Sequence, residues 1–260
     1  MTVALPLAVI TGGSSGIGLA LARLLVARGY RLVLAARGEE RLRSVVEELG
    51  ETVTGVVCDV TDEVAVRRLA EAVARHGDRL DLLVGNAGIP GRVGVLDADA
   101  EAAGRVMDVN YLGLVRVTQA LWPALERASG RVVNVVSVAG TVTVPDSAPY
   151  AASKHAALAY SRGLAAAGHR SGVRVLTVNP GPVSTAGFPQ SELLRSRLLR
   201  RAVLTDTACA EAILSAFDRG RTEVAIPRAW RLVGVLAAVA PTTVARVSGA
   251  VWKPQRASDR

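Results

Sequence analysis

The sequence predicts one doubly wound parallel α/β domain, and three features of its 260 residues indicate this fold. Short apolar runs alternate with amphipathic helical patterns from Leu7 to Ile226. A glycine-rich turn follows the first apolar run directly, and no linker, low-complexity run or internal repeat interrupts the alternation. Such strand–helix repeats are typical of a parallel sheet covered on both faces. We therefore expect a single domain over residues 1–227 and an apolar helical extension over residues 228–260.

The predicted strands and helices follow one another regularly along the chain. Runs of β-branched and apolar residues have the length and composition of buried parallel strands. They are Leu7–Ile10, Arg31–Ala36, Val53–Val57, Leu80–Val84, Arg131–Val136, Val173–Val178 and Glu223–Ile226. Patterns with apolar positions at helix spacing fill the intervals, at about residues 17–28, 41–49, 63–76, 101–127, 149–167 and 208–217.

The first strand ends in the segment TGGSSGIG, Thr11–Gly18, which then opens a helix. A strand, a glycine turn and a helix N-terminus together form a pocket for a pyrophosphate, because free backbone N–H groups and the helix dipole favour the anion. Gly12 lets the turn tighten, Gly16 lets the backbone approach the phosphates, and Gly18 lets the helix pack on the strand. The alternative is a flexible turn, which this context disfavours. The same segment supplies Ser14, Ser15 and Ile17 as candidate contacts to a dinucleotide.

The end of the second strand bears on which dinucleotide is bound. An NAD-preferring fold usually places an acidic residue there for the ribose 2′-hydroxyl. Here the sequence reads Ala35, Ala36, Arg37. The planar guanidinium of Arg37 suits a 2′-phosphate, and a solvated loop arginine is the alternative. We therefore expect NADP(H) as the cofactor.

A second candidate centre lies between Ser137 and Lys154. Tyr150 and Lys154 are at i and i+4, so both lie on one face if the segment is helical, and Pro149 suits its first turn. A phenol beside a fixed ammonium is a plausible proton-transfer pair, because the positive charge favours the phenolate. Ser137, at the end of a predicted strand, reaches the same place. Exposed Tyr and Lys also occur at this spacing by chance, so the pair alone is weak evidence for a reaction site. The glycine-rich turn at the other end of the chain strengthens that evidence.

Composition narrows the function classes. The net charge is +8, with 29 of the 31 basic residues being arginine. Such a positive charge is typical of proteins that bind nucleic acid, an anionic membrane or a phosphorylated ligand. A high-GC genome, which encodes Arg in place of Lys, explains it equally well. No nucleic-acid motif occurs. We expect Cys58 and Cys209 to be reduced core thiols, and His76, His155 and His169 lack metal-ligand spacing. The N-terminus has no signal-peptide pattern, so we expect a cytoplasmic protein.

Taken in order, these motifs resemble the compact form of the short-chain dehydrogenase/reductase family. The match runs over roughly Leu7–Ile226. It rests on T-G-x-x-x-G-I-G at Thr11–Gly18, Asn-Ala-Gly at Asn86–Gly88, Asn110, Ser137, Tyr150-x-x-x-Lys154, and Pro-Gly-x-Val-x-Thr at Pro180–Thr185. Several spaced motifs in the right order leave little room for chance.

The resemblance implies a Rossmann-type fold with a Ser–Tyr–Lys–Asn reaction site. Tyr150 would exchange a proton with the substrate oxygen, and Lys154 would lower the phenol pKa and hold the nicotinamide ribose. Ser137 would hydrogen-bond the substrate oxygen, and Asn110 would position a water in the proton path. A mid-helix Asn is otherwise only an exposed polar residue. The resemblance also implies cofactor contacts from Asp59 and Val60 at the adenine, Thr185 at the carboxamide, and Asn86, Ala87, Gly88, Pro180, Gly181 and Val183.

Two positions depart from the family pattern. Gly85 replaces the first Asn that is common in the family's Asn-Asn-Ala-Gly turn, which would loosen that loop and leave the site intact. Val136 replaces a frequent Ser beside the catalytic one. All four reaction-site residues are nevertheless present, which argues against an inactive relative.

The last part of the chain bears on the substrate. Residues 186–205 break the strand–helix rhythm with Leu pairs and Arg195, Arg197, Arg200 and Arg201, as a lid over a substrate pocket would, and a solvated amphipathic helix is compatible with this. In the extension, Leu232–Ala240 is uniformly apolar and too short to span a bilayer. It suits packing on the pocket or on a partner subunit, or else attachment to a membrane surface.

We therefore expect an NADPH-dependent reductase, or alcohol dehydrogenase, acting on a lipophilic ketone, steroid-like molecule or acyl chain. The nearest alternative is a 3-oxoacyl thioester reductase. A sugar-nucleotide epimerase or dehydratase shares Tyr-x-x-x-Lys but not this glycine spacing or chain length. From another class, a non-catalytic NADP-binding scaffold would keep the fold. Family members usually associate through the helices around Asn110 and Tyr150, so we expect a homodimer or homotetramer.

Overall fold

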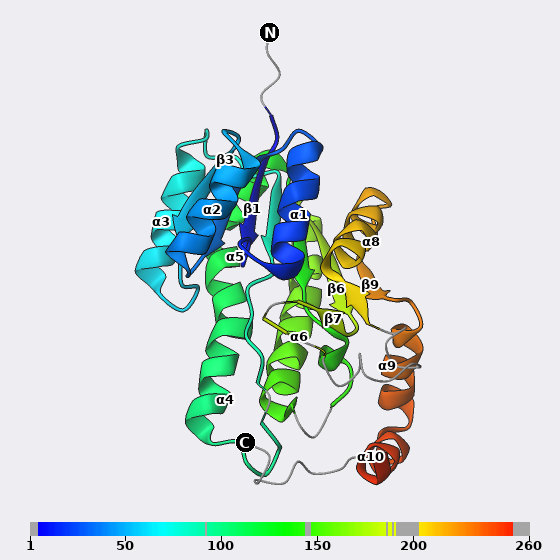
Figure 1. Ribbon diagram of the computed structural model, residues 1–260. Helices are drawn as coiled ribbons and strands as arrows, with labels where there is room; N and C mark the ends of the chain where they lie inside the picture. Colours follow the sequence, from blue (N-terminus) through cyan, green and yellow to red (C-terminus); the bar gives the residue numbers. More distant parts are fainter. Residues whose placement is uncertain are drawn as a thin grey trace.

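The computed structural model describes residues 5–91, 93–143, 147–185, 187–188, 190 and 203–251. A seven-stranded parallel sheet forms its centre, in the order β3-β2-β1-β4-β5-β6-β9 (Figure 1). The chain is therefore an α/β protein with a Rossmann-type fold, as the sequence predicts. The strands are β1 (Leu7–Thr11), β2 (Arg31–Ala36), β3 (Val53–Val57), β4 (Leu82–Gly85), β5 (Arg131–Val135), β6 (Arg174–Pro180) and β9 (Glu223–Ile226).

Helices cover both faces of this sheet, which explains why the central strands β1, β2 and β4 are buried apolar runs. In β1, Ala8 and Ile10 face one apolar cluster while Leu7 and Val9 face the other. The first cluster is closed by α1 (Gly16–Ala27), α2 (Glu39–Leu49) and α8 (Asp206–Asp218). The second is closed by α3 (Glu63–Ala74), α5 (Gly113–Ala128) and α6 (Ala148–Ser171). Leu and Val therefore build the core, and both cysteines are buried free thiols within it, as expected.

The strand order reverses between β1 and β4. From β1 the chain proceeds to β2 and β3 on one side, and then returns to place β4 on the other side of β1. Ligands of such sheets bind at the carboxyl ends of the two strands that flank this reversal. In Figure 1, the part of the molecule beyond these strand ends contains α4 (Ala100–Met107), α9 (Trp230–Val239) and α10 (Pro241–Val251).

The long helix expected over residues 101–127 is interrupted. Between α4 and α5 lies a π-helical turn, Asp108–Leu112, and Asn110 is in its centre. A π-turn widens the helix by one residue and is frequent at functional sites. This widening carries the Asn110 side chain inward, where it is 2% exposed. The alternative of an exposed, merely polar Asn110 is therefore wrong.

Two smaller differences concern the edges of elements. The fourth strand begins at Leu82 instead of Leu80, because the Leu80 amide donates to Ala124 and the Asp81 amide to Leu7, outside the β4 ladder. A short parallel pair, β7 (Val183–Ser184) with β8 (Leu204–Thr205), joins the two ends of the expected lid. Most of the lid expected over residues 186–205, including its four arginines, lies outside the described residues.

Candidate active site

The glycine turn is fastened to the end of β4 by Asn86 and Thr11. The Asn86 side-chain amide donates to the Thr11 carbonyl at 3.0 Å and to the Gly12 carbonyl at 3.3 Å. In return, the Thr11 hydroxyl accepts from the backbone amides of Asn86 at 2.9 Å and Ala87 at 3.1 Å. These bonds span the reversal between β1 and β4. They hold the Thr11–Gly18 and Asn86–Gly88 motifs together as one surface.

The start of α1 has the form of a phosphate cradle. Gly12 and Gly16 adopt positive φ angles of 65° and 52°, which favour glycine. A Cβ at Gly18 would collide with the Gly12 carbonyl oxygen, so the helix can approach the turn only without a side chain there. In the part of the chain that the structure describes, the Ser15 hydroxyl at the N-cap accepts no bond from the first turn of α1. These amides therefore suit the pyrophosphate of a dinucleotide.

Arg37 directly follows β2, at the same edge of the sheet as the glycine turn. Its guanidinium is exposed and lies 3.9 Å from an Asp59 carboxylate oxygen. The other Asp59 oxygen accepts from the Thr61 amide at 2.9 Å and from its hydroxyl at 2.8 Å, so Asp59 is held in place. The Val60 side chain points into the core, where it packs against Gly113. Arg37 and Asp59 thus line the edge where the adenosine end of a dinucleotide would lie.

Tyr150, Lys154 and Ser137 come together at the neighbouring strand end. Tyr150 and Lys154 are in the first turns of α6, and the Lys154 Nζ lies 5.6 Å from the Tyr150 ring centroid. The Lys154 side chain is 5% exposed, and its Nζ donates to the Val135 carbonyl at 3.3 Å. Ser137 lies two residues after β5, and its hydroxyl is close enough to Tyr150 to lower the pKa of the phenol. The i and i+4 spacing therefore places both side chains on one face, as expected.

Burial perturbs both ionisable groups. It raises the pKa of Tyr150, and the hydrogen bond from Ser137 partly opposes this rise. It lowers the pKa of Lys154 from 10.5 to about 8. In a site with little water, a phenolate beside an ammonium is stabilised more than either charge alone. Transfer of the phenolic proton is therefore favoured when Lys154 is protonated.

The lowered pKa of Lys154 predicts a pH-dependent stability. Between pH 8 and 10.5 the unfolded chain binds the lysine proton more tightly than the folded chain, so the contribution of Lys154 to the free energy of unfolding rises with pH. We expect the stability of Lys154→Met relative to wild type to fall by about 2 to 3 kcal/mol between pH 7 and 10. Urea denaturation at several pH values measures this difference.

The comparison with wild type also removes the effect of the cysteines. Burial raises the pKa of Cys58 to about 11 and that of Cys209 to about 12, so both lower stability with rising pH above about 9 in either protein. A stability difference between Lys154→Met and wild type that stays constant across pH 7–10 would contradict the lowered lysine pKa.

Asn110 uses its side chain to hold the site together. Its amide oxygen accepts from the Ile89 amide at 2.7 Å, and its nitrogen donates to the Ile89 carbonyl at 3.0 Å and to the Ser153 hydroxyl at 3.0 Å. Ser153 in turn donates to the Tyr150 carbonyl at 2.8 Å. Ser153 is not among the site residues that the sequence motifs predict. Its position three residues after Tyr150, on the same helix face, is the signal that was available.

The strand end at β6 completes the edge of the site. Pro180 ends β6, and the Gly181 amide donates to the Ile226 carbonyl at 2.8 Å. Val183 is buried in β7, and Thr185 lies beside Gly16, where an added Cβ would be 3.0 Å from the Thr185 side chain. Phe188, which no sequence motif predicts as a site residue, places its ring centroid 5.8 Å from that of Tyr150. A hydrophobic wall therefore borders the phenol.

The two departures from the family pattern leave this site intact. Gly85 is a buried residue of β4, and a Cβ there would crowd Leu114 and the Asn134 side-chain oxygen. These two side chains take up the space that the missing side chain leaves. Val136 is buried against Ala157 and Leu158 of α6. Gly88 lies beside Asn110 and Lys154, and a Cβ there would be 3.2 Å from the Asn110 oxygen.

The chain is similar to a known protein family and to individual members of it. The profile of the short chain dehydrogenase family matches residues 6–192. A dehydrogenase/reductase SDR family member 7B from Danio rerio is 41% identical over 188 residues, which are 68% of this chain and 60% of the relative. A putative ketoacyl reductase from Streptomyces coelicolor is 39% identical over 184 residues, which are 68% of this chain and 70% of that protein. The match thus spans less than two thirds of the Danio protein.

Solved structures extend the similarity to the fold as a whole. A short chain dehydrogenase/reductase from Burkholderia phymatum in complex with NAD has a TM-score of 0.80 at 28% identity, over 90% of this chain and 93% of that one. A single-residue variant of the actinorhodin polyketide ketoreductase with NADPH has a TM-score of 0.76 at 32% identity, over 85% of this chain and 94% of that one. These relatives bind nicotinamide dinucleotides of both kinds.

Proposed function

The chain belongs to the short chain dehydrogenase family of oxidoreductases, and from this premise we propose that it interconverts a carbonyl group and a secondary alcohol with NADP(H). One observation carries the proposal. The buried Lys154 ammonium, the Tyr150 phenol and the Ser137 hydroxyl meet at a strand end beside a glycine turn that can hold a pyrophosphate. This arrangement combines a proton donor with a place for a hydride donor.

In the direction of reduction, each residue has a defined part. Ser137 donates a hydrogen bond to the carbonyl oxygen and orients it toward Tyr150. Tyr150 gives its phenolic proton to this oxygen as the carbon accepts a hydride, which the nicotinamide supplies when it is bound. The Lys154 ammonium stabilises the phenolate that remains. Asn110, through Ser153, holds the first turn of α6 in position. Oxidation of an alcohol reverses these steps.

The choice of NADP(H) rests on Arg37. No carboxylate stands at the end of β2, and the exposed guanidinium can form charge-assisted bonds to a 2′-phosphate. Gly12, Gly16 and Gly18 would admit the pyrophosphate, and Thr185, beside Gly16, would contact the nicotinamide amide. Asp59 would bind near the adenine. Arg37 therefore favours NADP(H) over NAD(H).

A lipophilic substrate is supported by the surroundings of Tyr150. The Phe188 ring lies against the phenol, and the Trp230 indole at the start of α9 lies against Gly181, which follows β6. The more specific candidate is a 3-oxoacyl thioester. Its support is the similarity to the Streptomyces coelicolor putative ketoacyl reductase, whose length the match covers to 70%. A non-catalytic scaffold is disfavoured because the reaction-site residues are intact.

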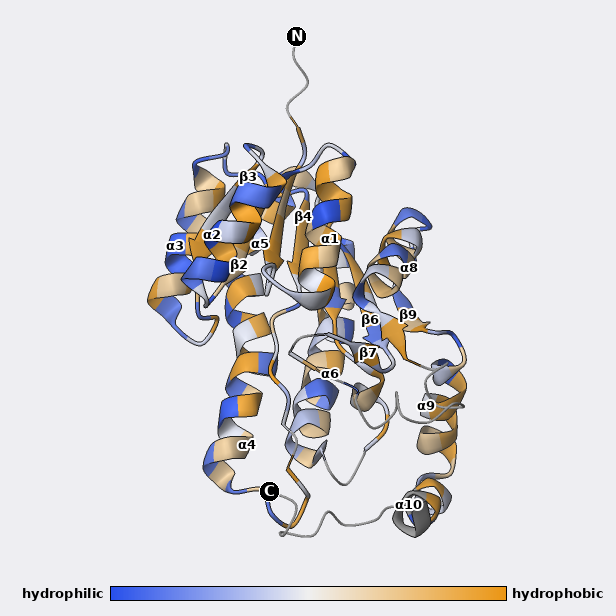
Figure 2. Ribbon diagram, viewed as in Figure 1, coloured by the Kyte–Doolittle hydropathy of each residue, from blue (hydrophilic) through white to orange (hydrophobic). Residues whose placement is uncertain are grey.

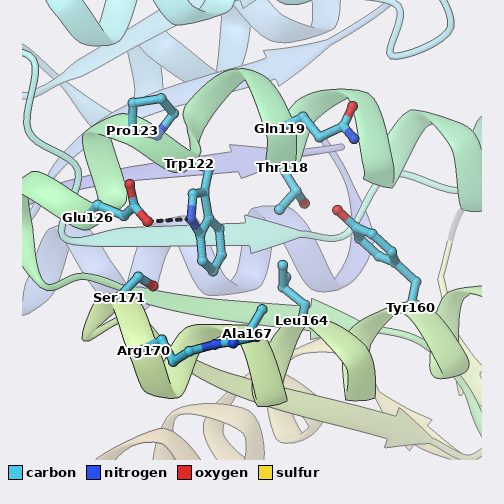
Figure 3. A pocket seen from close by; sticks show the side chains of 10 residues that line it. All are labelled: Thr118, Gln119, Trp122, Pro123, Glu126, Tyr160, Leu164, Ala167, Arg170 and Ser171. Atoms are coloured by element: carbon cyan, nitrogen blue, oxygen red, sulfur yellow. Dashed lines mark hydrogen bonds between the residues drawn. The ribbon is translucent and has the colours of Figure 1, made fainter.

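A groove between α5 and α6 supports assembly into a homodimer or homotetramer. It has a volume of about 650 Å³ and lies on the outer side of the two helices, between their C-terminal halves. Figure 3 shows Trp122 and Tyr160 extending into it from opposite helices, with the Trp122 Nε1 donating to Glu126 at 2.8 Å. A second copy packed on this surface would cover the indole and stiffen the helix that carries Tyr150.

The proposed function is tested by the oxidation of NADPH, and of NADH in parallel, with ketones and 3-oxoacyl thioesters of increasing chain length. We expect kcat/KM to rise with chain length and to be at least about tenfold higher with NADPH, in line with the loss of one charge-assisted contact to the cofactor. A preference for 3-oxoacyl thioesters over ketones of equal length would select the thioester reductase. Efficient turnover of short polar ketones alone would contradict the lipophilic substrate, and NADH preference would contradict the cofactor assignment.

A further inference from the structure

Helix α9 presents its larger apolar side chains to the outside. Leu232, Val235, Leu236 and Val239 are at i, i+3, i+4 and i+7, and so they form one stripe along the helix. Their exposed fractions lie between 49% and 73%. Figure 2 shows α9 as a largely hydrophobic ribbon at the margin of the molecule. We call these four residues the α9 stripe.

The orientation of α9 is fixed by its other face, which carries Trp230, Gly234 and Ala237. The Trp230 indole lies against Gly181, where any side chain would collide with it. Gly234 lies on Thr141, and a Cβ at Gly234 would be 2.9 Å from the Thr141 hydroxyl. Small residues thus face the protein and large ones face outward. Because rotation of the helix would break both contacts, the α9 stripe cannot turn inward.

Exposed apolar side chains concentrate on α9 and the helix that follows it. Twelve large hydrophobic side chains are exposed in the described part of the chain, and six of them lie on α9 and α10. Val233 and Val247 are the two beyond the stripe. Contiguous exposed apolar surface of this kind marks a site of interaction with a protein or a membrane.

The charge around the α9 stripe distinguishes between these occupants. No Asp or Glu occurs in residues 224–258, whereas Arg228, Arg231, Arg246, Lys253 and Arg256 do. The first three lie within the described residues, and all three are exposed. Two copies packed through this surface would bring like charges together. An anionic lipid surface instead complements the arginines and takes up the apolar side chains.

We propose that α9 and α10 bind this protein to the surface of an anionic membrane, with the α9 stripe inserted among the lipids. The attachment is interfacial: in the part of the chain that the structure describes, no helix is long and apolar enough to cross a bilayer. The inner face of α9 touches Thr141, four residues after Ser137, and Gly181 at the end of β6. Membrane binding therefore places the reaction site close to the lipids. The delivery of a lipophilic substrate from the membrane rests on the proposed function. The binding of the protein to the membrane does not.

Co-sedimentation of the full chain with vesicles tests the proposal without cofactor or substrate. The vesicles are phosphatidylcholine alone, or phosphatidylcholine with about 30% phosphatidylglycerol to supply anionic surface. We expect binding to the anionic vesicles that weakens as salt rises from about 0.1 to 0.5 M, since the attraction is partly electrostatic. Leu232→Ser/Val239→Ser should weaken binding at least about tenfold, because its apolar anchor is reduced. Arg228→Glu/Arg231→Glu should abolish the preference for anionic lipid.

A matched variant, Leu5→Ser/Val64→Ser, changes two exposed apolar residues outside α9 and α10 and should bind vesicles like wild type. Circular dichroism checks that each variant is folded. No binding by wild type, or equal binding by wild type and the stripe variant, would overturn the proposal. If wild type does not bind vesicles and the stripe variant has a lower mass than wild type in light scattering, the surface is an interface with a second copy of the chain. Loss of enzymatic activity in every assay would leave the vesicle result unaffected.

Discussion

Replacing Tyr150 by Phe should lower kcat by about 10² to 10⁴-fold while leaving the dissociation constant for NADPH within about threefold of wild type. The change removes the phenolic proton and keeps the ring that packs at 5.8 Å from Phe188. Because Lys154 is bonded to the Val135 carbonyl independently of the phenol, the cofactor side of the site stays in place. Steady-state kinetics and the fluorescence of bound NADPH measure the two quantities.

Tyr30→Phe is the matched control, because Tyr30 directly precedes β2, at the amino ends of the strands and away from the site. This variant should change neither kcat nor the dissociation constant for NADPH. Retention of most of the turnover by Tyr150→Phe would remove Tyr150 as the proton donor. A loss of NADPH binding by the same variant would instead make it a residue of the cofactor site. If Tyr150→Phe loses turnover and keeps NADPH, the scaffold alternative fails.

Arg37→Ala should raise the KM for NADPH by about 10- to 100-fold, because one or two charge-assisted hydrogen bonds to the 2′-phosphate are lost. The KM for NADH should change little, since NADH has no phosphate there. Arg37 is exposed, and its ion pair with Asp59 is long at 3.9 Å, so the substitution costs the fold almost nothing. Kinetics with both cofactors on the same substrate measure the effect as a change in their ratio.

A suitable control is Arg75→Ala, which removes another exposed arginine. Arg75 is at the C-terminal end of α3, beside the amino ends of the strands and away from the glycine turn. It separates the local contact from the general effect of net charge on an anionic cofactor. Equal increases in KM for NADPH and NADH, or no change in either, would contradict the assignment of Arg37 to the 2′-phosphate.

Much of this architecture was predictable from the sequence, for local physical reasons. Parallel strands buried on both faces must be apolar throughout, so β1 and β2 were predictable nearly to the residue. The glycine turn was equally predictable, because Gly12, Gly16 and Gly18 each lie where a side chain would meet a different close contact, all within the eight residues Thr11–Gly18. Tyr150 and Lys154 needed only the helical spacing of α6, which has Pro149 in its first turn.

Other features depend on contacts between distant segments and leave no local pattern. The π-turn at Asp108–Leu112 inserts one residue into a helix of ordinary composition, and its cause lies in the bonds between Asn110 and Ile89, 21 residues away. The hydrogen bond between Ser153 and Asn110 likewise could not be predicted from the sequence, because it depends on α6 packing beside that turn. The apolar run in α9 was visible, but which of its faces would point outward depends on Gly181 and Thr141.

The central claim is that hydride passes from NADPH to a carbonyl carbon as Tyr150 supplies the proton. The most direct test is the reaction of wild type and Tyr150→Phe with NADPH that carries deuterium at both C4 positions of the nicotinamide, with mass spectrometry of the product from a long-chain 3-oxoacyl thioester. We predict alcohol carrying one deuterium on the carbinol carbon from wild type, and almost no alcohol from the variant. Alcohol without deuterium on that carbon, or equal yields from the two proteins, would contradict the account.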